Sequence, residues 1–224
     1  MKKNADVVKQ FRLVYKVHMY FDPPEDDTYA QQQLYRQAVY DVISGRYPTS
    51  DKEMCELASV QIQVEYGDRG VELTKDNIWR FVPDKDKDAD DERKQSLIDR
   101  INKARIVVEG KDKFAAQKFY LDTVKSWKMY GSSFFFVEPQ MSVTFPDEVF
   151  LAINPRGILV IKPETKEVLK EYAYSEVPTW GHSGSSFVLH IGDLQKQDKH
   201  YFQTDQGKEI NELIRGYVER LANR

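Results

Sequence analysis

The sequence predicts an α+β fold, in which a helical bundle is followed by a seven-stranded antiparallel β sandwich and a C-terminal capping helix. Two observations carry this prediction. Between Pro23 and Lys128, apolar residues recur at the three- and four-residue spacing of amphipathic helices, whereas after Tyr130 short β-rich runs alternate with turn sequences. The run Gln206–Asn223 returns to helical spacing, so the chain is expected to end in a helix that covers an open end of the sheet.

Composition and charge limit the classes of function. With 224 residues, 41% of them hydrophobic, the chain is long enough to bury one large or two ordinary cores. The formal net charge of -3 gives no global field that favours nucleic acid as a partner. The single cysteine, Cys55, cannot form an intrachain disulfide, which indicates a reducing, cytoplasmic setting, and its thiol is predicted to pack rather than react. Without a signal peptide or an apolar run of roughly 18 residues, we expect a soluble protein that is not secreted.

The first element expected is a single strand. Apolar and polar residues alternate over Phe11–Phe21, which is the period of a half-buried strand, and the run ends at Asp22–Pro24. Because no partner strand follows nearby, this strand either joins a distant sheet or belongs to a domain that lies outside this sequence.

About four to five helices are expected next. Asp26 and Asp27 suit the start of the first helix, and Thr49 or Ser50 can cap the second, with Glu53 as the capping-box partner of Ser50. The tail of the second helix is ambiguous, because Val60–Tyr66 alternates as a strand would. The expected helical runs are Thr28–Ser44, the run from Ser50 through Tyr66, a short apolar piece at Asn77–Val82, Asp91–Val107 and Lys111–Lys128.

Seven β-rich runs separated by Pro- and Gly-containing turns form the second half of the chain. Seven short antiparallel strands capped by one helix are the pattern of a pleckstrin-homology (PH) or phosphotyrosine-binding (PTB) sandwich. The last two runs are predicted to pair as a hairpin. The expected strands are Phe134–Val137, Val149–Ile153, Ile158–Ile161, Val168–Tyr174, Glu176–His182, Phe187–Ile191 and Tyr201–Gln203.

This order of parts resembles the second and third lobes of a FERM domain. Leu34–Gly45 and Leu57–Asp68 look like the first two helices of the second lobe, which favours helix at Val60–Tyr66. Tyr130–Phe135 resembles the opening of the third lobe in unconventional myosin tails and in talin. The resemblance implies three regions in a fragment of a longer chain: a leading strand left from the first lobe (1–22), an acyl-CoA-binding-protein-like helical bundle (23–129) and a PH/PTB-like third lobe (130–224).

Two features distinguish the possible relatives. Glu138–Asp147 lacks the lysines of the corresponding talin loop, and Phe145–Glu148 followed by Leu151–Asn154 looks like the tails of class VII myosins. The resemblance therefore implies the non-catalytic FERM region of an actin-based motor tail, which recruits cargo, receptor tails or adaptors in actin-rich protrusions and contacts its own motor or rod.

Two alternatives remain beside the motor tail. A talin-like adaptor head would link receptor tails and anionic lipid to actin. The second alternative is a phosphatase or kinase with an appended FERM unit, although the sequence contains no Gly-rich phosphate loop, nucleophile elbow or Ser–His–Asp arrangement.

The fifth strand and the C-terminal helix are expected to form the main site. In the resembled family, the groove between them accepts receptor tails by strand addition. Pro178 suits an edge strand because it lacks a backbone donor. Thr179 stands where talin-type grooves have a basic residue, which argues against an integrin-type ligand. The expected groove residues are Thr179, Trp180, Gly181, His182, Ile210, Ile214 and Tyr217; the alternative is that Trp180 and the helix stripe are core.

Arg100–Lys128 is the second candidate surface, with eight basic and three acidic residues. Such a face suits anionic lipid, where each basic residue contributes about 1 kcal/mol, but the pattern also fits an ordinary solvated helix surface. The expected lipid contacts are Lys103, Arg105, Lys111, Lys113, Lys118, Lys125 and Lys128. His190 and His200 are expected to pair structurally across the hairpin, and no metal or cofactor is expected.

Overall fold

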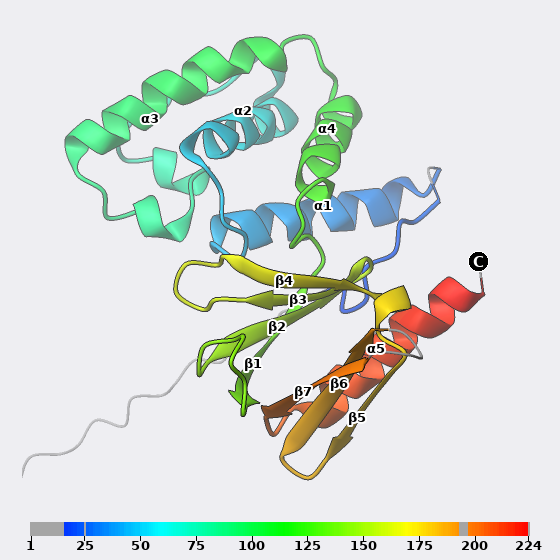
Figure 1. The fold of residues 1–224 in the computed structure, drawn as a ribbon. Coiled ribbons are helices and arrows are strands. Elements are labelled where there is room, and N and C mark those ends of the chain that lie inside the picture. The colour runs from blue at the N-terminus through cyan, green and yellow to red at the C-terminus, as the bar shows by residue number, and fades with distance from the viewer. Residues whose placement is uncertain (1–15, 25, 193–196, 224) are drawn as a thin grey trace, which may run out of the picture.

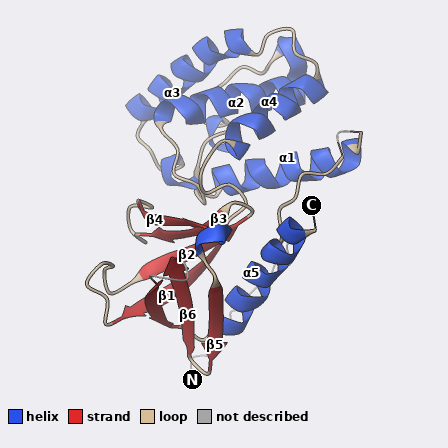
Figure 2. Cartoon of the chain, turned by 45° about the vertical axis from the view of Figure 1, so that its right-hand side comes forward, coloured by secondary structure: helices blue, strands red, loops and turns tan. Residues whose placement is uncertain are grey.

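The computed structural model describes residues 16–24, 26–192 and 197–223, which form a helical lobe and a sheet lobe (Figure 1). Helix α1 (Thr28–Ile43) lies between the rest of the helical lobe and the sheet, and α5 (Gly207–Ala222) lies against the sheet (Figures 1 and 2). The predicted α+β architecture is confirmed.

The helical lobe contains three further α-helices and four short 3₁₀ turns. Asp27 caps α1, and the predicted capping box of Ser50 and Glu53 is present. The helices are α2 (Asp51–Tyr66), α3 (Asp91–Ala104) and α4 (Lys113–Lys125); the turns are η1 (Gly67–Arg69), η2 (Ile78–Arg80), η3 (Asp84–Asp86) and η4 (Arg105–Val107).

Helix α2 is continuous through Val60–Tyr66, so helix was the right prediction there. The strand-like alternation misleads because α2 is enclosed on several sides, and its glutamines are buried along with its apolar residues. Gln63 is an example: its amide nitrogen donates to the Lys111 carbonyl and to Asp68 Oδ1, both at 2.8 Å. In α2, therefore, polar residues do not mark a solvent face.

A charged cluster joins the start of α2 to α3. The Arg93 guanidinium contacts both oxygens of Asp51, at 2.6 and 2.7 Å, and Arg100 adds a third contact at 3.0 Å. These hydrogen bonds, those of Arg93 above all, hold the pKa of Asp51 well below its usual range. A carboxylate with a lowered pKa stabilises the fold above its unfolded-state pKa of about 4, and this contribution is lost as the pH falls through the lower folded-state value.

We therefore expect Asp51→Asn to lower the free energy of unfolding at pH 7 by about 1 kcal/mol, a modest loss because the pair is partly exposed to solvent. The difference from wild type should shrink as the pH falls below about 4. Urea unfolding at pH 7 and at pH 2 measures both quantities. If wild type and Asp51→Asn differed in unfolding free energy by the same amount at the two pH values, the lowered pKa assigned to Asp51 would be contradicted.

Seven antiparallel strands form the sheet lobe in the order β4-β3-β2-β1-β7-β6-β5. Strand β1 pairs with β2 over residues 133–137 and with β7 over 138–140, so it joins the two halves of the sheet. The strands are β1 (Ser133–Gln140), β2 (Val149–Asn154), β3 (Gly157–Ile161), β4 (Val168–Ala173), β5 (Thr179–Ser183), β6 (Ser186–Gly192) and β7 (Gln197–Gln203). The start predicted for the fifth strand is wrong, because Tyr174–Glu176 forms the 3₁₀ turn η5.

The predicted leading strand needs correction. Residues 11–15 lie outside the described part of the chain, and residues 16–21 form no strand. Val17 pairs instead with the side chain of Gln37 on α1: its N–H donates to Gln37 Oε1 at 2.7 Å, and its carbonyl accepts from Gln37 Nε2 at 3.2 Å. The alternating side chains contact two lobes, with Tyr20 in the helical core and Met19 and Phe21 against the sheet core.

The predicted histidine pair is also wrong. His190 lies opposite Lys199 in the β6–β7 register, whereas His200 lies opposite the buried Leu189. Directly opposite residues share a face and neighbouring residues alternate, so the two histidines point to opposite faces of the hairpin. His200 packs instead beside Tyr172, with its Nε2 at 3.3 Å from the phenol oxygen.

Candidate peptide-binding groove

Strand β5 is an edge of the sheet, because within the described residues it pairs only with β6. A two-residue turn at 184–185 joins the strands, with Ser183 opposite Ser186. Such a turn closes on a hydrogen-bonded pair, and hydrogen-bonded pairs then alternate along an antiparallel ladder. The backbone groups of Trp180 and His182 therefore point to the open edge. Pro178 lies two residues before Trp180, so its backbone also points to the open edge. Its nitrogen carries no hydrogen and offers no hydrogen-bond donor there.

The four predicted strand residues lie along this edge. Thr179 and His182 are exposed, and Gly181 is half-buried. Trp180 is also half-buried and packs against the sheet core. Trp180 therefore has both a core contact and an accessible surface, so the two interpretations made from the sequence each describe part of its environment.

The three predicted helix residues do not line an open surface. Ile210, Ile214 and Tyr217 are at most 1% exposed and belong to the sheet core. They face the core because the apolar stripe of α5 is what attaches the helix to the sheet. The prediction that these side chains contact a ligand directly is therefore corrected: they form the support beneath the groove.

The side of α5 that faces β5 can be identified from its glycines. A Cβ on Gly207 would come within 2.9 Å of the His182 Cβ, so the start of α5 lies directly against β5. At 100° per residue, Asn211, Ile214 and Val218 all follow Gly207 along the same side of the helix; Ile214 is buried, whereas Asn211 and Val218 are half-buried. Asn211 and Val218 are therefore the residues with accessible surface on this side of α5, and sequence reasoning missed them. The close approach allowed by Gly207 was the signal that could have located them.

The leading segment holds α5 from its opposite side. Gly216 lies half a helical turn away from Gly207 in angle, and a Cβ there would come within 2.6 Å of the Met19 methyl carbon. The Tyr20 backbone N–H donates to the Tyr217 hydroxyl at 3.1 Å, and the Arg220 guanidinium lies 5.1 Å from the centre of the Phe21 ring. Among these contacts, that of Gly216 with Met19 lies on the side of α5 opposite to Gly207 and β5.

A buried polar cluster connects the leading segment to α1. The Asp41 carboxylate, 1% exposed, accepts from Lys16 Nζ at 2.6 Å and from the Tyr20 hydroxyl at 3.2 Å. Burial raises the pKa of Tyr20, so its hydroxyl remains protonated and donates. Gly131 approaches the Tyr20 ring so closely, at a φ of +72°, that a Cβ there would lie 2.9 Å from the ring. This cluster fixes the segment that braces α5.

The predicted basic face divides into two groups. Lys118, Lys125 and Lys128 form ion pairs with Asp122, Asp22 and Glu171. The other four predicted residues have no ion pair within the described residues: Lys103, Arg105, Lys111 and Lys113. Three large apolar side chains near them are exposed, namely Ile106 (76%), Val107 (59%) and Phe114 (59%).

Neither a metal-binding cluster nor a helix that could span a membrane occurs in the described residues. No group of three or more His, Cys, Asp or Glu side chains is placed to hold a metal ion in that part of the chain. Among the helices described, none combines the length and the apolar character that crossing a membrane requires. Cys55 is buried, and burial raises the pKa of its thiol.

Two family models match the chain in the order of its lobes. The FERM central domain matches residues 23–135, and the PTB domain of IRS-1 type matches residues 137–222. The first match covers half of the chain and coincides with the helical lobe, and the second coincides with the sheet and α5. The chain belongs to the FERM family.

Relatives with similar sequences include cytoskeletal proteins of two kinds. The chain is 31% identical to FERM domain-containing protein B of Dictyostelium discoideum, over 96% of the chain and 48% of that protein. It is 25% identical to mouse unconventional myosin-VIIb, over 99% of the chain and 11% of the myosin. For chicken talin-1 the identity is 31%, over 85% of the chain and 7% of the talin. The chain thus spans less than half the length of each relative.

Solved structures show the same fold. The MyTH4-FERM MF2 domain of Dictyostelium discoideum myosin VII aligns with a TM-score of 0.79 and 19% identity, covering 91% of this chain and 42% of that one. The human myosin 7b C-terminal MyTH4-FERM domain, solved in complex with the harmonin-a PDZ3 domain, aligns with a TM-score of 0.69 and 21% identity over the same shares of the two chains.

Proposed function

We propose that this chain is a non-catalytic protein-interaction module, and that its β5–α5 groove binds an extended segment of a partner by strand addition. The observation that carries the proposal is the open edge of β5 beside α5, where the backbone groups of Trp180 and His182 face outward. An added strand gains affinity from backbone hydrogen bonds and specificity from side-chain pockets. The exposed part of Trp180, with Asn211 and Val218, would supply such a pocket.

The partners that suit this site are cytoplasmic tails of membrane receptors or adaptor proteins. Similarity to myosin-VIIb supports the FERM region of an actin-based motor tail, and similarity to talin-1 supports an adaptor head as the alternative. The human myosin 7b MyTH4-FERM domain, solved in complex with the harmonin-a PDZ3 domain, supports a protein as the partner. We place the chain at the actin cytoskeleton beneath membranes, where a motor tail would also contact its own motor or rod.

A peptide-display selection tests the groove. Peptides selected against the wild-type chain should also bind His182→Ala, which keeps the outward backbone N–H, but should not bind His182→Pro, which removes it. Equal binding to the two variants, with both folded, would overturn strand addition at β5.

Anionic lipid is a second candidate ligand, at the connection between α3 and α4. The exposed Ile106 and Val107 lie between Arg105 and Lys111, two basic residues without ion pairs in the described part of the chain. Apolar side chains that enter the interface, combined with basic residues that attract anionic headgroups, are how peripheral proteins bind membranes.

Sedimentation with phosphatidylserine-containing vesicles tests this surface. The double variant Ile106→Asp/Val107→Asp should reduce the bound fraction by about tenfold, because two apolar contacts are replaced by charges that the membrane repels. Tyr29→Asp, an equally exposed position on α1, is the matched control and should bind as wild type does. No dependence on anionic lipid would remove the proposal.

A further inference from the structure

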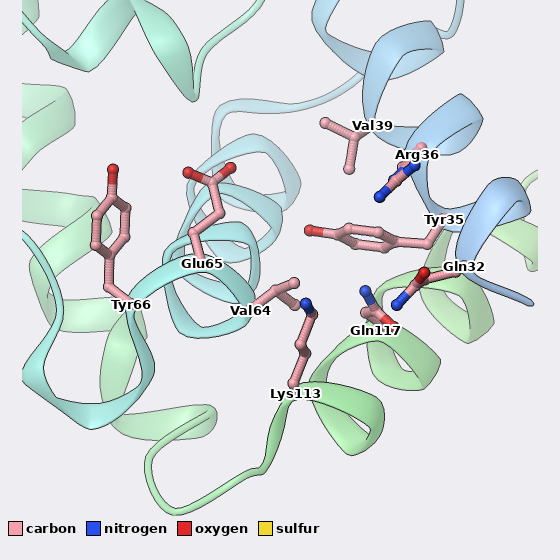
Figure 3. A pocket seen from close by; sticks show the side chains of 9 residues that line it. All are labelled: Gln32, Tyr35, Arg36, Val39, Val64, Glu65, Tyr66, Lys113 and Gln117. Atoms are coloured by element: carbon pink, nitrogen blue, oxygen red, sulfur yellow. The ribbon is translucent and has the colours of Figure 1, made fainter. Parts of the chain in front are cut away.

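The helical lobe contains a cavity that is separate from the groove and is not needed for strand addition. It has a volume of about 510 Å³ and lies between α1, the end of α2 and the start of α4 (Figure 3). In Figure 3 the Tyr35 ring extends from α1 toward α2, and the Lys113 side chain extends from α4 toward it.

Two buried polar side chains line this cavity without a hydrogen-bond partner. Tyr35 is 6% exposed and Gln117 is 7% exposed, and within the described residues neither the hydroxyl nor the amide is hydrogen-bonded. Among the described residues, the fully enclosed polar side-chain atoms without a partner are Arg46 Nε and Asp86 Oδ2, which do not line this cavity. The Tyr35 hydroxyl and the Gln117 amide therefore open onto the cavity and are available to hydrogen-bond a ligand there.

The Tyr35 ring is held in place and its hydroxyl is a donor. The ring packs edge-on against Tyr120, with 5.2 Å between the ring centres. Burial raises the pKa of Tyr35, and the nearby Glu65 raises it further, so the hydroxyl remains protonated at physiological pH. Tyr35 therefore presents a hydrogen-bond donor that is already oriented, and the Gln117 amide offers a second donor in the same cavity.

The charge around the cavity is positive. Arg36 on α1 and Lys113 on α4 both line it, and neither forms an ion pair within the described residues. The acidic residue at the rim, Glu65, already has partners: Arg80 lies 3.5 Å away, and Gln61 donates to it at 3.1 Å. Two cations therefore remain available to a ligand, while Val39 and Val64 add an apolar wall.

We propose that this cavity binds a phosphate monoester, carried either by a small soluble molecule or by a lipid headgroup. A phosphate monoester carries close to two negative charges at pH 7 and offers three acceptor oxygens. Its charge matches Arg36 and Lys113 together, and its oxygens match the donors of Tyr35 and Gln117. A carboxylate would leave one cation uncompensated.

Calorimetric titration of the whole chain with phenyl phosphate tests the site, with phenylacetate as the monoanionic comparison. Phenyl phosphate should bind more tightly than phenylacetate. Tyr35→Phe, Arg36→Gln and Lys113→Gln should each weaken binding about tenfold, because each removes a hydrogen bond or ion pair to a charged group. Lys118→Gln, on the same helix but outside the cavity, is the control and should bind as wild type does.

The melting temperature of each variant distinguishes a loss of the binding site from a loss of the fold. Tyr35→Phe removes a buried hydroxyl that has no protein partner, so this variant should melt at or above the wild-type temperature. Glycerol 3-phosphate then represents a small soluble carrier of the phosphate, and vesicles containing phosphatidic acid represent a lipid headgroup. Whichever of the two binds the wild-type chain should bind Tyr35→Phe more weakly. Absence of binding to all three phosphates, binding unaffected by the three variants, or a lowered melting temperature for Tyr35→Phe would overturn the proposal.

Discussion

Replacing Asp41 by alanine is expected to lower the free energy of unfolding by about 3 kcal/mol, the cost of breaking a buried ion pair from one side. Asp41 is the acceptor for both Lys16 and the Tyr20 hydroxyl at the junction of the leading segment and α1. Without the carboxylate, a buried hydroxyl and a half-buried ammonium lose their partner. Urea unfolding of the purified chain at pH 7 measures the loss.

Asp122→Ala is the matched control for this prediction. Asp122 also pairs with a lysine, Lys118, but both side chains are exposed on α4, so its loss should change stability by less than about 0.5 kcal/mol. If the two variants lose equally little, the leading segment is not held by a buried cluster, and the bracing of α5 through Tyr20 and Tyr217 would also be in question.

The second large effect concerns partner binding. His182→Pro should weaken a groove-binding peptide at least about tenfold relative to His182→Ala, because the missing N–H leaves a buried acceptor of the added strand unsatisfied. The variant should still fold, since proline is tolerated where the N–H of an edge strand faces outward. Fluorescence anisotropy with a labelled peptide gives the two dissociation constants.

Thr179→Pro gives the complementary result. By the alternation of the ladder, the Thr179 N–H bonds to β6 rather than facing the edge, so proline there should destabilise the sheet. If His182→Pro destabilised the sheet and Thr179→Pro did not, the assignment of the Thr179 N–H to β6 and of the His182 N–H to the open edge would have to be reversed.

The sequence predicted the order and type of the elements well, because most of them have one buried and one exposed face. It was weakest where that condition fails. Helix α2 is buried on several sides, so Val60–Tyr66 shows a strand-like alternation, and only the resemblance to a FERM lobe decided for helix. The leading segment alternates as a strand would, but its alternating residues do not share one face: Val17 packs against the helical core, and Met19 and Phe21 pack against the sheet core. Periodicity alone cannot distinguish this arrangement from a strand.

The groove was located correctly in the chain, but its helix side was not. The stripe of Ile210, Ile214 and Tyr217 showed that one face of α5 is buried, but no pattern within a single helix tells which flank of that face lies beside β5. That information comes from the contact between Gly207 and His182, which are distant in sequence. The cavity was missed for a similar reason, since Tyr35 was assigned to an apolar face and Gln117 had no pattern at all.

Amide hydrogen exchange along β5 tests the central claim most directly. In the free chain, the amides of Thr179 and Gly181 should exchange slowly because they bond to β6, while those of Trp180 and His182 should exchange fast; a peptide selected against the groove should slow these two. Slow exchange at Trp180 and His182 in the free chain, or no change when the peptide binds, would contradict a groove that works by strand addition.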